Sequence, residues 1–382
     1  MNPNQLNDQN VLVRVDFNVP IEKGKVLSTQ RIDATIPILK QLLAQKNSII
    51  IATHLGRPKG VDPHLSTLIL KPLLEERLQT SIHWEGTWPQ DNIQFQKGQV
   101  YLVDNLRFNP EETDCDQEWV KKTLRNIDSV VMDAFSCAHR DHASIKGWID
   151  HAPVILPGPL FEKEVAVLKK VLHQSSSVMA IVGGSKVSTK TSLLMTLLSK
   201  VDTLVLGGGI ANTFLKAQGL NIGRSLVDDD WVDFSKEMLV RAEALDKTII
   251  LPMDVIILDS HGECRSVDLV EVTDDDCIFD VGNETMKVVQ ESFNKTDTIL
   301  WNGPLGRYED PRFNQSTEFL GKALKDYKGW SVAGGGDTIA ALESLNLLES
   351  VDYASMAGGA FLSYIENDGL TNVNSLYERI NV

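Results

Sequence analysis

The sequence is poor in cysteine. Its 382 residues include four, widely spaced and without a C-x-x-C pair: Cys115, Cys137, Cys264 and Cys277. This spacing disfavours a disulfide framework and a zinc site, and is typical of reduced thiols in the cytosol. Apolar runs are short too, and none approaches the ~18 residues that a membrane-spanning helix needs. The first ten residues are polar, so we expect no secretory signal peptide. We therefore expect a soluble cytoplasmic protein.

Basic residues are also outnumbered. The chain has 37 Lys and Arg against 52 Asp and Glu, a net charge of −15. A field of that sign repels nucleic acids and anionic membranes, so we expect neither as a partner. A local cluster of arginines in so acidic a chain is correspondingly more informative than it would be in a basic one.

The common nucleotide-binding motifs are absent. There is no G-x-x-x-x-G-K-[ST] loop and no G-x-G-x-x-G fingerprint. His139, Arg140 and Asp141 imitate the catalytic triplet of protein kinases, but Lys146 stands where that motif needs Asn and no D-F-G follows. These absences exclude a P-loop enzyme, a dinucleotide-binding dehydrogenase and a protein kinase.

Short apolar runs alternate with helical patterns along the whole chain, which is typical of parallel sheets wrapped by helices. They lie at 11–15, 48–52, 100–103 and 129–132 in the first part, and at 178–182, 203–206, 248–251, 298–301 and 330–332 in the second. A single core stops growing near ~250–300 residues, so this length predicts two domains. We predict two doubly wound parallel-sheet (Rossmann-like) α/β domains.

A boundary is indicated by residues 151–159, which carry three prolines and a glycine. Phe161, Val165, Leu168 and Leu172 then recur at helical spacing, and we interpret this segment as a helix between the domains. A crossover helix inside a single sheet is the alternative. The predicted parts are a first domain at 1–154, the interdomain helix at 155–175, a second domain at 176–364 and a tail at 365–382.

Polar and basic residues follow the strands of the first half. Parallel strands bring their carboxyl ends to one edge, where ligands bind, so these side chains are predicted to converge. Arginine forks suit phosphate and carboxylate, which indicates a site for a compact polyanion. In the alternative, each arginine pairs with a nearby acid: Asp33, Asp104, Asp133 or Asp141. The converging residues are Arg31, His54, Arg57, Arg107 and Arg140.

Glycines occupy the same places in the second half, at 183–184, 207–209, 303–306, 334–336 and 358–359. Glycine lets backbone approach a ligand closely, and a following helix presents free N–H groups to phosphate. A tight turn between a strand and a helix could explain one such glycine-rich loop, but it hardly explains five. Lys186 and Lys190 are placed to reach phosphate oxygens, and Asp337 is a candidate Mg²⁺ ligand.

Together these residues resemble the phosphoglycerate kinase family. The similar blocks, in the family's order, are Arg14–Pro20, His54–Pro58, Asn105–Phe108, Asp133–Phe135, Ala138–Arg140, Gly183–Lys190, Trp301–Gly306 and Gly334–Thr338. The resemblance implies reversible Mg²⁺-dependent transfer between 1,3-bisphosphoglycerate with ADP and 3-phosphoglycerate with ATP, in glycolysis. It implies two domains joined by a helix and hinge, with the ligand cleft between them, and in-line transfer after the hinge closes. The tail is then expected to return to the first domain, and the default state is a monomer.

Site residues follow by motif match. Arg31 and Lys190 would be catalytic and flank the transferring group. His54 would hold an anion, since transfer onto a carboxylate leaves a general base no proton to remove. The phosphoglycerate ligands would be Asp16, Phe17, Asn18, Arg31, His54, Leu55, Gly56, Arg57, Arg107 and Arg140. The nucleotide ligands would be Lys186, Lys190, Gly207, Gly208, Asn302, Pro304, Glu309, Gly335, Gly336, Asp337 and Thr338, with Glu309 on the ribose and Asp337 also on the metal.

Four features depart from the family's pattern. Met356 and Ala357 interrupt a loop usually read S-T-G-G-G, Asn283 replaces a proline, and Arg307 replaces a small apolar residue. The ending also lacks the usual leucine-proline-glycine tail. Two alternatives therefore stay open: a homologue that binds nucleotide without catalysis, and a kinase for a different acid.

Overall fold

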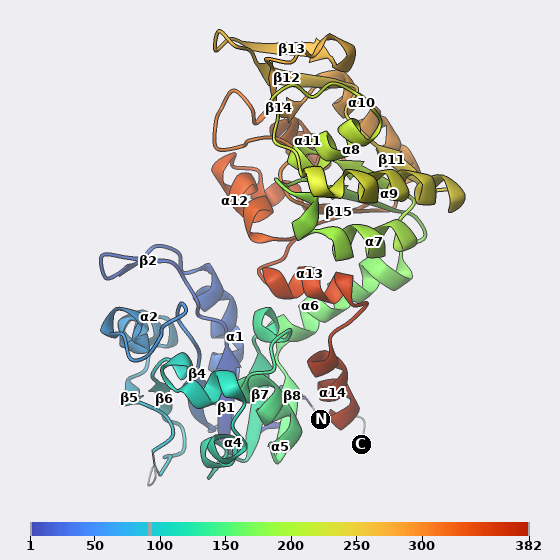
Figure 1. The fold of residues 1–382 in the computed structure, drawn as a ribbon. Coiled ribbons are helices and arrows are strands. Elements are labelled where there is room, and N and C mark those ends of the chain that lie inside the picture. The colour runs from blue at the N-terminus through green and yellow to red at the C-terminus, as the bar shows by residue number, and fades with distance from the viewer. Residues whose placement is uncertain (1, 91–93, 381–382) are drawn as a thin grey trace. The chain divides into compact units, whose positions relative to one another are not determined.

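The computed structural model describes residues 2–90 and 94–380, which form two compact units (Figure 1). Of the described residues, the first unit comprises those up to Ala166 and those from Gly369 onward, and the second comprises Val167–Asp368. Within the described residues, no helix is both long and apolar enough to cross a bilayer.

The first unit is built on a sheet whose six described strands are all parallel. Its order is β5 (Ile82–Gly86), β6 (Val100–Val103), β4 (Ser48–Ala52), β1 (Asn10–Val15), β7 (Ser129–Asp133) and β8 (Val154–Pro157). Every residue of β4, β6 and β7 is buried, so these strands are covered on both faces and read as unbroken apolar runs. A short hairpin, β2 (Ile21–Glu22) and β3 (Lys25–Val26), lies outside the sheet.

The helices of this unit are α1 (Gln30–Ala44), α2 (Lys71–Leu78), α3 (Pro110–Asp114), α4 (Gln117–Thr123), α5 (Trp148–His151), α6 (Pro159–Lys169) and α14 (Thr371–Ile380). The division between the units falls within α6. Helix α14 belongs to the first unit: Asn372 Nδ2 donates to the carbonyls of Ala138 and Arg140 at 3.0 and 3.1 Å. The end of the chain therefore supports the loop that carries Arg140.

The second unit also has a parallel sheet with six described strands. Its order is β11 (Thr248–Ile250), β10 (Thr203–Leu206), β9 (Val178–Val182), β15 (Thr298–Asn302), β16 (Trp330–Ala333) and β17 (Tyr353–Ala354). Successive strands are added toward one side of the sheet from β9 to β11, and toward the other side from β15 to β17. The point between β9 and β15 where this order switches is where open α/β sheets bind ligands. A separate antiparallel sheet holds β13 (Cys264–Asp268), β12 (Asp254–Leu258) and β14 (Cys277–Val281).

The helices of the second unit alternate with its strands. They are α7 (Thr191–Lys200), α8 (Gly208–Ala217), α9 (Val232–Ala244), α10 (Asn283–Ser292), α11 (Gln315–Lys325), α12 (Gly336–Ser344) and α13 (Gly359–Glu366). Helices α8, α12 and α13 begin at glycine-rich segments of the sequence, so their first backbone N–H groups stand beside loops without side chains.

The predicted α/β class with two parallel sheets is confirmed, and each of the nine apolar runs coincides with a strand to within a residue. Several strands were not predicted. β5 and β13 each have a single buried residue and so lack an apolar run. β8 lies inside the proline-rich segment that we took for a boundary, because its prolines masked a strand at the edge of the sheet.

Asp133 joins the end of β7 to the start of α6. Its Oδ1 accepts hydrogen bonds from the backbone N–H groups of Leu160 and Phe161, at 2.7 and 3.1 Å, while Oδ2 is buried without a partner. Burial raises the pKa of this carboxyl to about 7, against the two N–H groups that favour the charged form. The helix is thus capped by an acid that resists ionising.

We predict that Asp133→Asn, which keeps the accepting oxygen, stabilises the protein more at pH 8 than at pH 5. The raised native pKa means that the folded chain holds this proton more tightly than the unfolded one, so stability falls as pH rises from about 4 to about 7. The variant does not lose stability in this way. The difference in the free energy of unfolding between the variant and the wild type should therefore grow by at least ~1 kcal/mol from pH 5 to pH 8. Thermal unfolding at both pH values measures it, and a constant difference would contradict the assignment.

Candidate active site

The loops after β1 and β4 are tied together at the edge of the first sheet. The Asp16 carboxylate forms an ion pair with Arg31 of α1 and accepts a hydrogen bond from the Ser136 hydroxyl. Asn18 Oδ1 accepts from the backbone N–H of Gly56 at 2.8 Å. Burial lowers the pKa of Arg31, although the guanidinium stays charged at any pH at which the protein folds.

Phe17 and Leu55 lie in the same loops, but their side chains are fully buried. Phe17 donates its backbone N–H to Thr53 Oγ1 at 2.9 Å. Any contact that these two residues make with a ligand would therefore use backbone atoms.

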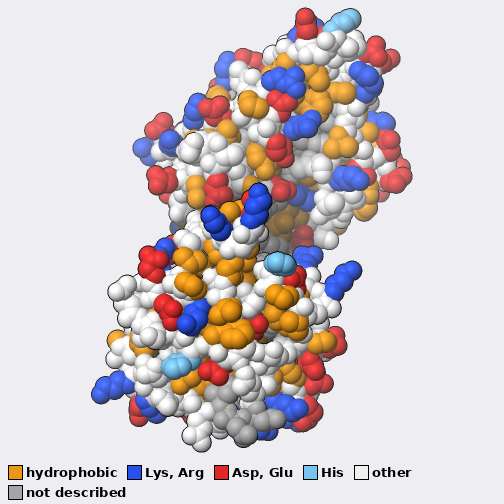
Figure 2. All heavy atoms as spheres, turned by 90° about the vertical axis from the view of Figure 1, so that its left-hand side faces the viewer, with side chains coloured by type: hydrophobic (Ala, Val, Ile, Leu, Met, Phe, Trp, Pro, Cys, Tyr) orange, Lys and Arg blue, Asp and Glu red, His pale blue; other side chains and the backbone are white. Residues whose placement is uncertain are grey.

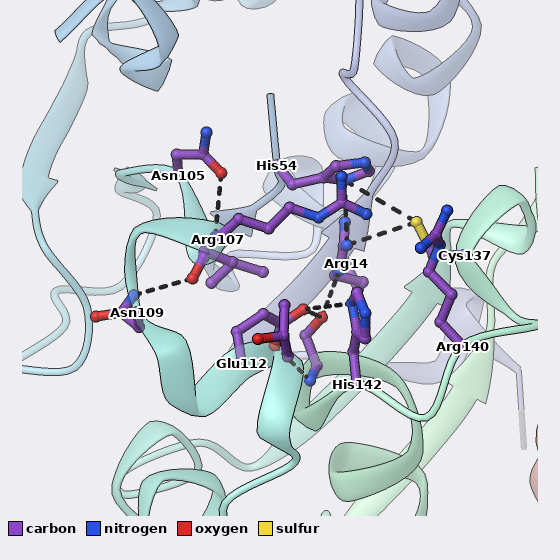
Figure 3. Close-up of polar contacts among 12 residues, drawn as sticks. Arg14, His54, Asn105, Arg107, Asn109, Glu112, Cys137, Arg140 and His142 are labelled. Carbon is purple, nitrogen blue, oxygen red and sulfur yellow. Dashed lines mark hydrogen bonds and ion pairs between the residues drawn. The ribbon is translucent and has the colours of Figure 1, made fainter. Parts of the chain in front are cut away.

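His54 and Arg107 meet buried Arg14 beneath this edge (Figure 3). Arg14 Nη2 lies 3.3 Å from His54 Nδ1, and Arg107 Nη1 donates to the carbonyl of Gly56 at 2.6 Å. Burial, with Arg14 as the next largest cause, lowers the pKa of His54 well below its usual range. Burial also lowers the pKa of Arg107 to about 10. His54 is consequently neutral at pH 7.

A cavity of about 370 Å³ opens beside Arg107, and neither Arg14 nor His54 lines it. Arg57, Arg107, Arg140 and His142 all line it, and no carboxylate does. Like charges brought this close repel one another, so a compact anion would relieve the arrangement. The cavity thus has the charge and size for a small phosphorylated acid.

The four acids considered as partners of the arginines form contacts with other residues. Each binds elsewhere: Asp33 pairs with Arg77 at 2.9 Å, Asp104 accepts from Ser66 and Thr67, Asp133 caps α6, and Asp141 accepts from Asn372. Asp16, which was not among those four, pairs with Arg31, so that arginine does have an acidic partner.

Sequence reasoning missed the buried supports of this site. Glu112 is fully buried on α3 and binds Ser144, while Cys137 Sγ lies 3.7 Å from Arg14 Nη2. Glu112 lies in an acidic stretch that reads as an exposed helix start. No motif marks it, so its burial could not be foreseen.

In the second unit, Lys190 reaches the switch point between β9 and β15. Its Nζ donates to the carbonyl of Gly183 at 2.6 Å and to Asn302 Oδ1 at 2.7 Å. Burial lowers the pKa of Lys190 to about 8, against the opposing charge of Asp337. The ammonium is therefore held at the ends of two neighbouring strands.

Glycines allow the loops around Lys190 to touch. A Cβ on Gly183 would lie 1.9 Å from the carbonyl oxygen of Pro304. Gly335 has φ +97°, and a Cβ there would lie 2.4 Å from Asn302 Nδ2. Asn302 donates from that nitrogen to the carbonyl of Gly334 at 2.7 Å, which joins the ends of β15 and β16. Only backbone without side chains fits here.

A cavity of about 540 Å³ lies beside these loops, which suits a nucleotide. Of the predicted nucleotide ligands, Gly208, Pro304, Glu309 and Asp337 line it. The others are not among its lining residues. Lys186 is exposed, Gly336 begins α12, and the remainder are buried or half-buried, namely Lys190, Gly207, Asn302, Gly335 and Thr338.

The departures from the family's pattern are accommodated locally. Ala357 is buried and has no positive φ, since the left-handed position falls on Gly358 at φ +56°. Asn283 begins α10, where Asp254 caps the helix by accepting from the N–H groups of Glu284 and Thr285. Arg307 lines the cavity, with its guanidinium 5.7 Å from the Phe279 ring.

Comparisons with known proteins agree with one another. The family model described as phosphoglycerate kinase matches residues 1–368. A phosphoglycerate kinase of Francisella philomiragia is 40% identical over 99% of this chain and 97% of that protein. The solved phosphoglycerate kinase of Coxiella burnetii has a TM-score of 0.93 at 38% identity, and that of Pyrococcus horikoshii 0.82 at 28%. Each covers 98% of this chain and 97% of its own.

We predict that Gly335→Ala lowers the free energy of unfolding by ~1–3 kcal/mol, because the added Cβ enforces strain at φ +97° and displaces Asn302. Gly336→Ala is the matched control: nothing lies within 4 Å of its Cβ position. Thermal or denaturant unfolding of both variants measures the difference. Equal stability of the two would refute the close approach described here.

Proposed function

Because the chain belongs to the phosphoglycerate kinase family, we propose that the two cavities hold the two substrates of that reaction. The enzyme transfers a phosphoryl group in glycolysis, with a carboxyl group as acceptor. It connects 1,3-bisphosphoglycerate and ADP with 3-phosphoglycerate and ATP.

The observation that carries the assignment is the contrast between the cavities. The first unit offers arginine side chains and no carboxylate around about 370 Å³, and the second offers glycine backbone with apolar side chains such as Phe279 and Leu305 around about 540 Å³. We assign phosphoglycerate to the first, with Arg57, Arg107 and Arg140 on its anionic groups. We assign the nucleotide to the second, with Glu309 on the ribose and the start of α12 toward the phosphates.

The reaction follows from these placements. In the direction that consumes ATP, a carboxylate oxygen of 3-phosphoglycerate forms a bond to the γ-phosphorus as the bond to ADP breaks, and no proton is transferred. In the transition state, negative charge spreads over the oxygens of the transferring phosphoryl group. The main contribution that the protein can make to the rate is therefore to position cations beside these oxygens. We assign that role to Arg31 and Lys190. Since they belong to different units, closure about a hinge would bring them in line and exclude water.

Mg²⁺ would neutralise phosphate charge in the same step. Among the described residues, no group of three or more His, Cys, Asp or Glu side chains could hold a metal. Mg²⁺ on nucleotides commonly takes one or two carboxylates with phosphates and water. Asp337 is exposed in the first turn of α12 and lines the nucleotide cavity, so it fits that role.

The remaining assignments concern the molecule as a whole. Cys115, Cys137, Cys264 and Cys277 are unpaired thiols, which favours a reducing, cytoplasmic location. On the face seen in Figure 2, hydrophobic side chains lie among charged ones of both signs. We take a monomer as the default state, because closure about a hinge is easier for a free two-domain chain.

Lys190→Ala is predicted to lower kcat by ~10³-fold or more while weakening nucleotide binding far less, because its cation acts on charge developed in transit. A coupled assay of ATP consumption with 3-phosphoglycerate and Mg²⁺ measures turnover. Lys287→Ala, which removes an exposed lysine paired with Glu284 on α10, is the control and should retain activity. Undiminished turnover of the Lys190 variant would rule out its role.

Asp337→Asn is predicted to raise the Mg²⁺ concentration needed for half-maximal activity by ~10-fold or more, since it removes one charged ligand of the metal. Titration of Mg²⁺ at fixed ATP measures the shift, and removal of Mg²⁺ by a chelator should abolish turnover in both proteins. An unchanged Mg²⁺ titration would mean that the metal is held without this carboxylate.

A further inference from the structure

A chain of buried polar contacts runs beneath His54, and no step of the proposed reaction uses it (Figure 3). Arg14, Glu112 and Ser144 are each fully buried. Arg14 Nε donates to Ser144 Oγ at 2.9 Å, and that hydroxyl donates to Glu112 Oε1 at 2.6 Å. The Ser144 backbone N–H donates to Glu112 Oε2 at 2.8 Å. A buried cation and a buried anion are thus joined through a serine.

This chain fixes the direction of the Arg14 guanidinium. Nη1 donates to the carbonyl of Val15 at 2.6 Å, so the fork is held on two sides. The remaining nitrogen, Nη2, faces His54 Nδ1 at 3.3 Å and Cys137 Sγ at 3.7 Å. Rotating the guanidinium away from His54 would break several buried hydrogen bonds at once, each costly to leave unmade.

A guanidinium can only donate hydrogen bonds. The nitrogen that faces Arg14 must therefore carry a lone pair, and the proton of the neutral ring must sit on the other nitrogen, Nε2. Within residues 2–90 and 94–380, no hydrogen bond to His54 Nε2 is formed, so this N–H has no protein acceptor, although His54 is 4% exposed and does not itself line the 370 Å³ cavity.

We propose that the Arg14–Ser144–Glu112 chain sets the tautomer of His54, so that an uncharged Nε2–H donates to an oxygen of the acidic substrate. The opposite tautomer would turn a lone pair toward an anion and repel it. This inference rests on the proposed function, because it takes the ligand at His54 to be phosphoglycerate. Arg14 is then a positioning residue, which acts on the substrate through His54, and Glu112 supports it while also facing His142 Nδ1 of the cavity lining at 3.6 Å.

The tautomer can be observed without turnover. Two-bond ¹H–¹⁵N correlation spectra of the ¹⁵N-labelled wild-type protein, with the His54 signals assigned by comparison with His54→Ala, distinguish the two ring nitrogens. The expected result at pH 7 is a protonated Nε2 and an unprotonated Nδ1. A protonated Nδ1, or a ring that averages the two forms, would overturn the proposal even in a fully active enzyme.

Kinetics test whether the positioning matters. Arg14→Met combined with Glu112→Gln removes both buried charges together, so neither is left unpaired. We expect the KM for 3-phosphoglycerate to rise ~10-fold and the KM for ATP to stay unchanged, because loss of one hydrogen bond to a charged group costs about that much. Arg77→Met, which removes a half-buried arginine of the same unit that pairs with Asp33, is the control.

A purely structural role is distinguished by a third background. In His54→Ala the double substitution should add little to the KM for 3-phosphoglycerate, since its effect passes through the missing ring. An equal rise with and without His54 would overturn the proposal. Failure of the proposed function is a separate outcome, because a wild-type protein without turnover would still give the tautomer spectrum.

Discussion

The two six-stranded sheets are each parallel, and this places the carboxyl ends of the strands in each sheet along one edge of that sheet. The rest of the structure depends on that constraint. In the first unit it gathers Asp16, His54 and Arg107 from three separate strands, and in the second it brings Gly183 beside Asn302. Residues far apart in sequence thus become neighbours without any long loop having to fold over the sheet.

The two edges use that proximity differently. The first presents cationic side chains, whose mutual repulsion is offset by a buried carboxylate at Glu112 and by the ion pair between Asp16 and Arg31. The second presents glycine backbone and apolar side chains, with the half-buried cation of Lys190 close to its glycine loops. A small acid with two anionic groups is bound by cationic side chains placed around those groups. A nucleotide needs the protein backbone to approach it closely along its length, and glycine permits that approach.

Much of this could be predicted from the sequence. The buried strands are recognisable in the sequence as apolar runs. The residues that follow them, such as Arg57 and Lys190, lie at the edge where parallel sheets commonly bind ligands. What could not be predicted depends on three-dimensional packing. Glu112 reads as an exposed acid, β8 hides among prolines, and the partner of Asp133 lies 27 residues further along the chain. Such features have no local pattern, because their cause is burial by distant segments.

The acceptors around Lys190 are all neutral oxygens, from Gly183 and from Asn302. A lysine held on a carboxylate would have to break an ion pair before it could serve another anion. Here an incoming phosphate competes with dipoles and with the charge of Asp337, which already acts on the lysine. Hydrogen bonds to neutral oxygens thus fix the position of the Lys190 ammonium, and they can be exchanged for a phosphate oxygen without an ion pair being broken.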